Sequence, residues 1–118
     1  MNQRQRDFRA WLLRNFPDTN VSQQFMKLIK ELGELAQVVV KWEQGIYTGP
    51  SPRIAMKKEL GDVLIVVNAI GALLDLDTEE AFDYAWGITG QRNWVKFREE
   101  RGSHGDNEPG SEQTPKTV

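Results

Sequence analysis

Four acidic residues stand in two pairs on neighbouring segments of the chain. Glu31 and Glu34 are three residues apart, and so are Glu59 and Asp62. Residues i and i+3 of a helix share a face, so each pair would present its carboxylates on one side. Clustered carboxylate oxygens suit Mg²⁺ or Mn²⁺, and the chain has no cysteine and a single histidine to hold a softer metal. The spacing therefore predicts an all-oxygen metal site.

The two acidic pairs are placed symmetrically about a predicted turn. Residues 45–50 are rich in Gly and Pro, and the midpoint of the four acidic positions falls among them. If the flanking segments form an antiparallel helical hairpin, the pairs lie at the same height. Surface ion pairs are the competing interpretation, since three lysines precede acids by four residues: Lys27 with Glu31, Lys30 with Glu34, and Lys58 with Asp62.

Two observations favour the metal site over surface pairing. The acids continue apolar helical stripes, and carboxylates set in such a stripe need a strong partner. Gly33 and Gly61 stand between the paired acids. Each glycine costs about 1 kcal/mol relative to alanine inside a helix. We therefore expect a backbone or a ligand to approach closely at both glycines.

Helical periodicity indicates four elements that position these acids. The expected helices cover 3–16, a segment from Asn20 or Ser22 to about 44, 52–74, and a fourth from about 78 to 98 that contains Gly87 and Gly90. No segment alternates as a half-buried strand does, so we predict an all-α, four-helix bundle. Residues 63–74 are apolar nearly all round, which one small bundle could hardly cover. A homodimer or homotetramer is expected.

Composition limits the classes of partner. The 118 residues are 39% hydrophobic and 27% charged with a net charge of −2, which offers no basic field for nucleic acid. The longest apolar run is shorter than the roughly 20 residues of a membrane span, and no secretory signal is recognisable. We expect a cytoplasmic protein with one domain at 1–101. Residues 102–118, including His104, are predicted to be a disordered polar tail.

The acidic motifs resemble those of the MazG-like nucleoside triphosphate pyrophosphohydrolases. Residues 27–36 (KLIKELGELA) look like the first motif of that family, and 58–64 (KELGDVL) look like the second. Residues 74–82 and 92–94 are similar to the start and end of the last helix in the family. The resemblance implies Mg²⁺-dependent cleavage of a (d)NTP to a (d)NMP and pyrophosphate, which removes unwanted nucleotides from the pool. Its metal-binding and catalytic residues would be Glu31, Glu34, Glu59 and Asp62.

The resemblance also bears on substrate contacts. Arg92 is the candidate for binding the phosphates, and Trp11 is the candidate for stacking on the base, with the first helix closing the base pocket. Phe8, Trp42, Tyr47 and Trp86 are further aromatic candidates, although core or interface positions are the usual fate of such residues. Asn68 is expected to be a buried residue that bonds across a helix interface.

Two other classes of function remain open. Many relatives carry Lys and Asn in the last helix, where this chain has Ala85 and Thr89. In the second interpretation, the loss of these two residues leaves a catalytically weak helical module that binds nucleotides or protein partners and keeps the metal site. In the third interpretation, the protein is a structural α-helical oligomer whose acids serve only in surface pairing.

Overall fold

The computed structural model describes residues 1–101, and these form helices without strands, which confirms the all-α prediction. The helices are α1 (Gln3–Asn15), α2 (Val21–Glu43), α3 (Pro52–Leu73), α4 (Thr78–Thr89) and α5 (Trp94–Arg101). The chain divides into two compact units, of which the first is Met1–Glu79 and the second begins at Glu80. The predicted polar tail at 102–118, with His104, lies outside the described residues.

Side-chain caps fix where the first three helices begin. The side-chain oxygen of Asn2 accepts a hydrogen bond from the backbone of Gln5 at 2.9 Å, and that of Asn20 accepts one from Gln23 at 2.8 Å. Ser51 caps α3, with Pro52 in its first turn. These groups satisfy amides that a helix N-terminus leaves without intrahelical partners. Asn20, one of two candidates from sequence, is thus the residue that starts α2.

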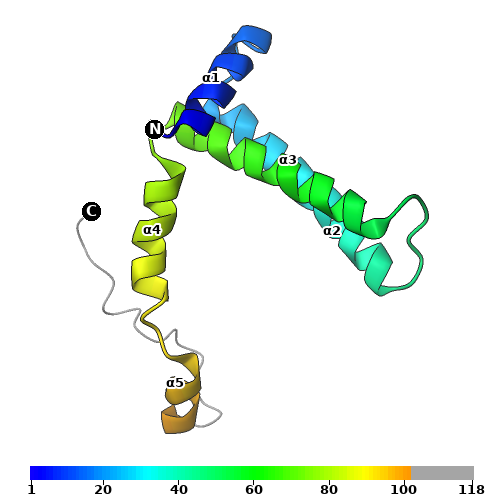
Figure 1. The fold of residues 1–118 in the computed structure, drawn as a ribbon, viewed down its shortest axis with the longest axis vertical. Coiled ribbons are helices and arrows are strands. Elements are labelled where there is room, and N and C mark those ends of the chain that lie inside the picture. The colour runs from blue at the N-terminus through cyan, green and yellow to red at the C-terminus, as the bar shows by residue number, and fades with distance from the viewer. Residues whose placement is uncertain (102–118) are drawn as a thin grey trace. The chain divides into compact units, whose positions relative to one another are not determined.

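The second and third helices form the predicted antiparallel hairpin (Figure 1). Gly45 follows α2 with a φ of 73°, a backbone conformation that glycine adopts at little cost. Directly after it, the amide of Ile46 donates to the carbonyl of Lys41 at 2.9 Å, which closes the end of the helix. The loop then returns the chain to Ser51, and α3 runs back along α2.

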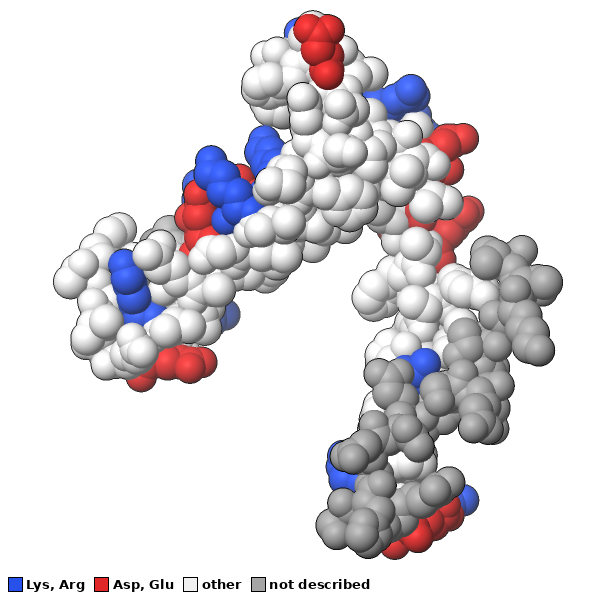
Figure 2. Space-filling view, turned by 180° about the vertical axis from the view of Figure 1, so that it is seen from behind, with Lys and Arg blue, Asp and Glu red and all other residues white. Residues whose placement is uncertain are grey.

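The core of the first unit is small and comes largely from α3. Its buried apolar residues are Leu12 of α1 and Val63, Val66, Ala69, Ile70 and Ala72 of α3. Many larger apolar side chains on the hairpin stay exposed, including Leu60 at 49% and Leu64 at 53%. Figure 2 shows broad surfaces without charged side chains next to charges gathered midway along the α2–α3 arm. None of the described helices is both long and apolar enough to cross a membrane.

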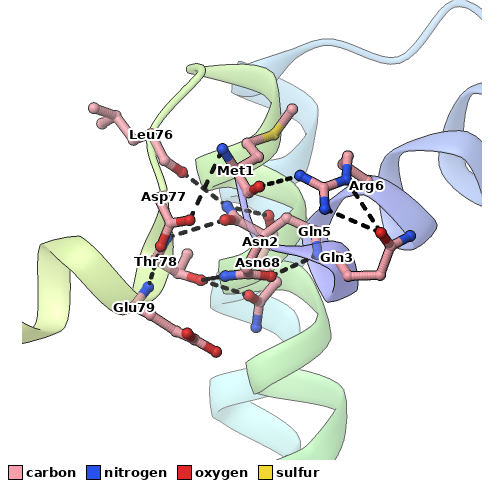
Figure 3. A network of polar contacts seen from close by, with 10 residues as sticks. All are labelled: Met1, Asn2, Gln3, Gln5, Arg6, Asn68, Leu76, Asp77, Thr78 and Glu79. Atoms are coloured by element: carbon pink, nitrogen blue, oxygen red, sulfur yellow. Dashed lines mark hydrogen bonds and ion pairs between the residues drawn. The ribbon is translucent and has the colours of Figure 1, made fainter.

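A polar network joins α1 to the end of α3 (Figure 3). Gln5 is fully buried, and its Nε2 donates to the carbonyl of Leu76 at 2.8 Å while its Oε1 accepts from the amide of Thr78 at 3.1 Å. Thr78 Oγ1 donates to Asn68 Oδ1 at 2.7 Å, so Asn68 bonds across elements as predicted, although it is half-buried rather than buried. A Cβ at Gly71 would lie 2.7 Å from Gln5 Nε2, which leaves room only for glycine.

The predicted fourth helix is present as α4, and its expected C-terminal part forms the separate short helix α5. The amide of Gly90 still bonds to the carbonyl of Trp86 at 2.7 Å, and the helix ends there. Asn93 Oδ1 then accepts from the amide of Lys96 at 2.8 Å. Because the Asn93 side chain satisfies an amide in the first turn of α5, α5 begins as a new helix and does not continue α4.

Candidate metal centre

The hairpin brings three of the four predicted acids together. One carboxylate oxygen from each of Glu31, Glu34 and Glu59 lies within 4.8 Å of the other two. Glu31 on α2 is buried, with 8% of its surface exposed, while Glu34 and Glu59 are half-buried. Both helices therefore contribute at one height, as the symmetric spacing about the turn predicted. We call these three residues the carboxylate cluster.

Asp62 lies outside the carboxylate cluster and is engaged by a lysine. Its Oδ2 is 2.7 Å from Nζ of Lys58, one helical turn earlier. Its charge nevertheless contributes to raising the pKa of Glu31, so it belongs to the same electrostatic environment. Lys30 Nζ is 4.0 Å from Glu34 Oε1. Two of the three ion pairs expected from spacing thus form.

The third expected ion pair, between Lys27 and Glu31, is not among the contacts of residues 1–100. Burial raises the pKa of Glu31 above its ordinary value of 4.5, and the neighbouring charges of Glu34 and Asp62 raise it further, whereas Lys30 lowers it. A carboxylate that is shielded from water and close to other carboxylates is costly to ionise. Surface pairing therefore does not account for Glu31.

The free oxygens of the carboxylate cluster fit a hard cation. Glu31 Oε2 and Glu59 Oε2 are buried, and neither has a hydrogen-bond partner. Buried polar atoms in proteins are almost always bonded, and these two oxygens are therefore available to bind a ligand. Carboxylate oxygens are what Mg²⁺ and Mn²⁺ bind. Glu31, Glu34 and Glu59 could hold such an ion.

The glycines between the acids have no close neighbour in the described part of the chain. A Cβ added at Gly33 or at Gly61 would meet no atom of the described residues within 4 Å. Within the described residues no backbone approaches either glycine, so that alternative is wrong there, and the close approach of a ligand stays a prediction. Gly61 instead lines an apolar groove of about 700 Å³ along α2 and α3, together with residues that include Leu35, Leu60 and Leu64.

The two predicted substrate contacts lie in different units. Trp11 on α1 is 45% exposed, and its ring meets that of Phe16 edge-on with 6.0 Å between centroids. Arg92 is half-buried between α4 and α5. A pocket of about 220 Å³ that sequence reasoning missed lies where α1 meets α2, lined by Phe16, Thr19, Gln23, Gln24 and Lys27. The only advance signal was the aromatic residue directly before the Pro17 break.

Comparison with known families identifies the hairpin. The MazG nucleotide pyrophosphohydrolase domain family matches residues 21–87, which include α2, α3 and most of α4. The chain belongs to this family, and all four predicted acids lie within the matched segment. Comparisons with curated proteins and with solved structures found no match.

Proposed function

We propose that this protein is a divalent-cation-dependent nucleotide pyrophosphohydrolase that converts a (d)NTP to the (d)NMP and pyrophosphate. The observation that carries the proposal is the carboxylate cluster, whose buried oxygens on Glu31 and Glu59 lack partners, within the family segment. Carboxylates that are shielded from water and close to one another are costly to ionise without a cation nearby. A cation that also binds phosphate oxygens would account for it.

The positions of the acidic residues suggest which of them would bind the cation and which could activate water. Glu31, Glu34 and Glu59 would hold Mg²⁺, with Asp62 beside them. The bound cation would neutralise phosphate oxygens and make the anhydride easier to attack. A carboxylate not fully used as a ligand can orient water and accept its proton while the bond between the α- and β-phosphates breaks. Trp11, which lies in the same unit as the carboxylate cluster and against the ring of Phe16, remains a proposed contact to the base.

A homo-oligomer is part of the same proposal. The hairpin exposes large apolar side chains such as Phe25, Leu32 and Leu60, each between 47% and 49% exposed. Contiguous exposed apolar surface of this kind marks an interaction site. A second copy of the chain would cover it, as the apolar character of α3 led us to expect.

The proposed activity is tested by measuring pyrophosphate release from a panel of canonical and modified (d)NTPs with Mg²⁺. We would compare the wild type with Glu34→Gln and Asp62→Asn, which keep shape and remove charge, and with Glu43→Gln as an exposed control on the same helix. Turnover that needs the cation and is lost in the first two variants supports the hydrolase. Metal binding without turnover would instead favour the binding module, and no response to metal would favour a structural oligomer.

A further inference from the structure

The pocket between α1 and α2 is shaped by the way the two helices are connected. Phe16 ends α1 by donating its amide to the carbonyl of Leu12 at 2.7 Å, and the amide of Thr19 donates back to the carbonyl of Phe16 at 3.1 Å. Asn20 then caps α2. These bonds fix both walls of the pocket. Its volume of about 220 Å³ corresponds to several water molecules at about 30 Å³ each, which is room for a flat ring.

The lining of this pocket combines one aromatic face with polar groups that can read a ring edge. Phe16 is 52% exposed, and the ring of Trp11 lies edge-on against it. Gln24 is only 6% exposed, and its Nε2 donates to Thr19 Oγ1 at 3.0 Å, which holds both groups in place. Amides and hydroxyls donate and accept, and aromatic faces stack on nucleobases.

The pocket and the carboxylate cluster are both lined by residues of α2. Gln24, Lys27 and Glu31 are at positions i, i+3 and i+7 of α2, so they share a helix face. Seven residues at 1.5 Å each separate Gln24 from Glu31 by roughly 10 Å along the axis. In a nucleoside triphosphate, the sugar and the α-phosphate together separate the base from the β-phosphate by a distance of this order. One nucleotide can therefore occupy the pocket and reach the cluster.

Lys27 is the positively charged residue of α2 between Gln24 of the pocket and Glu31 of the carboxylate cluster. Lys30 and Lys58 are held by Glu34 and Asp62, whereas Lys27 forms no ion pair within residues 1–100. It is half-buried and lines the pocket, one turn before Glu31. An ammonium placed there without a carboxylate partner suits an anion that passes from the pocket toward the cluster.

We propose that this pocket binds the base of a nucleoside triphosphate, with Phe16 stacking on the ring and Lys27 contacting the phosphate chain. Gln24 and Thr19 present the hydrogen-bonding edge that sets base preference. The proposal rests on the proposed function, since it names where the substrate of the same site binds. It makes Lys27 a substrate-binding residue and assigns it no part in metal binding.

Kinetics of the full-length protein test the role of Lys27. Lys27→Met is expected to raise KM for the best (d)NTP roughly tenfold to a hundredfold, as loss of a charged hydrogen bond does, while Lys27→Arg retains most of the affinity. Lys41→Met, on an exposed position of α2, is the matched control. The rise in melting temperature on adding Mg²⁺ alone should be the same in all of them. A KM for Lys27→Met equal to that of Lys41→Met would overturn the assignment.

Base preference tests the role of Phe16. Phe16→Leu keeps an apolar side chain but removes stacking, so kcat/KM for the preferred base should fall roughly tenfold and the ratios among bases should flatten. Phe16→Tyr keeps the ring and should retain the wild-type ratios. Unchanged ratios in Phe16→Leu would show that the base binds elsewhere.

Failure of this inference is distinguishable from failure of the proposed function. If the wild type releases no pyrophosphate from any nucleotide, the proposed activity fails, and the pocket is tested by equilibrium dialysis with labelled dNTPs and Mg²⁺. Weaker binding in Lys27→Met and Phe16→Leu than in Lys41→Met would support the pocket without catalysis. Equal binding in all variants, or none in the wild type, would overturn it.

Discussion

At the scale of single residues, Glu31 differs from every other acid in the first unit. It is buried, one of its oxygens lacks a partner, and its pKa is raised chiefly by burial and then by Glu34 and Asp62. A group in this state weakens the fold unless a ligand compensates it. The same carboxylate would then link metal binding, protonation and stability.

Stability of the metal-free protein should therefore fall as the pH rises from 4.5 through the raised pKa of Glu31. The folded state holds this proton more tightly than the unfolded chain does, so ionisation over that interval favours unfolding. Urea unfolding in EDTA at several pH values measures the effect. Glu31→Gln should remove this part of the decline, and Glu43→Gln should not. An identical pH dependence in wild type and Glu31→Gln would contradict the prediction.

Metal should reverse that loss. At neutral pH, Mg²⁺ is expected to raise the melting temperature of the wild type in proportion to the logarithm of its concentration above Kd, since a ligand that binds only the folded state stabilises it by mass action. Glu59→Gln should abolish the shift, because Glu59 supplies the carboxylate from α3. A full Mg²⁺ response in this variant would place the ion elsewhere.

At the scale of elements, α1 is joined to α3 by packing around one glycine. A Cβ at Gly71 would lie 2.7 Å from Gln5 Nε2, 2.8 Å from Thr78 Cγ2 and 3.0 Å from the carbonyl of Leu76. Backbone and buried amide cannot both move away, since Gln5 is bonded to the same segment. The position of α1, and with it the pocket wall, depends on this contact.

Gly71→Ala is expected to lower the free energy of unfolding by roughly 1–3 kcal/mol, the usual cost of overfilling a packed site. Gly33→Ala is the matched control, since a Cβ there meets nothing. It should stabilise the protein by up to about 1 kcal/mol through helix propensity. Denaturant unfolding measures both, and equal effects of the two substitutions would contradict the packing argument.

At the scale of the whole molecule, the hairpin carries large apolar side chains on the surface of the single chain. Leu60 and Leu64 line the groove of about 700 Å³, and each is about half exposed. The four predicted acids are absent from that lining. Assembly through the groove would therefore not involve the four predicted acids.

Light scattering should therefore give a mass that is a multiple of the 13.5 kDa chain. Replacing Leu60 and Leu64 together with Glu is expected to shift the mass toward the monomer, because buried unpaired charge opposes association. Lys41→Glu, away from the groove, should leave the mass unchanged. A monomeric wild type would contradict the proposed oligomer directly.

Local sequence determined the helices and much of the site. Caps such as Asn20 and Ser51 act within one turn, and the spacing of Glu31 with Glu34 sets a shared face whatever surrounds it. The symmetric placement of Glu59 about the turn was also readable, because a short loop forces antiparallel helices into register. These features depend on distances along the chain.

Tertiary structure decided which of these groups meet. The rotation of α3 against α2 brings Glu59 to the cluster and leaves Asp62 with Lys58, and the path of α1 makes Gly71 the tightly packed glycine. Tertiary structure also brings Phe16 and Lys27 together in the lining of one pocket. Such outcomes depend on the packing of whole helices, where many small contacts act together, and spacing along one helix does not contain them.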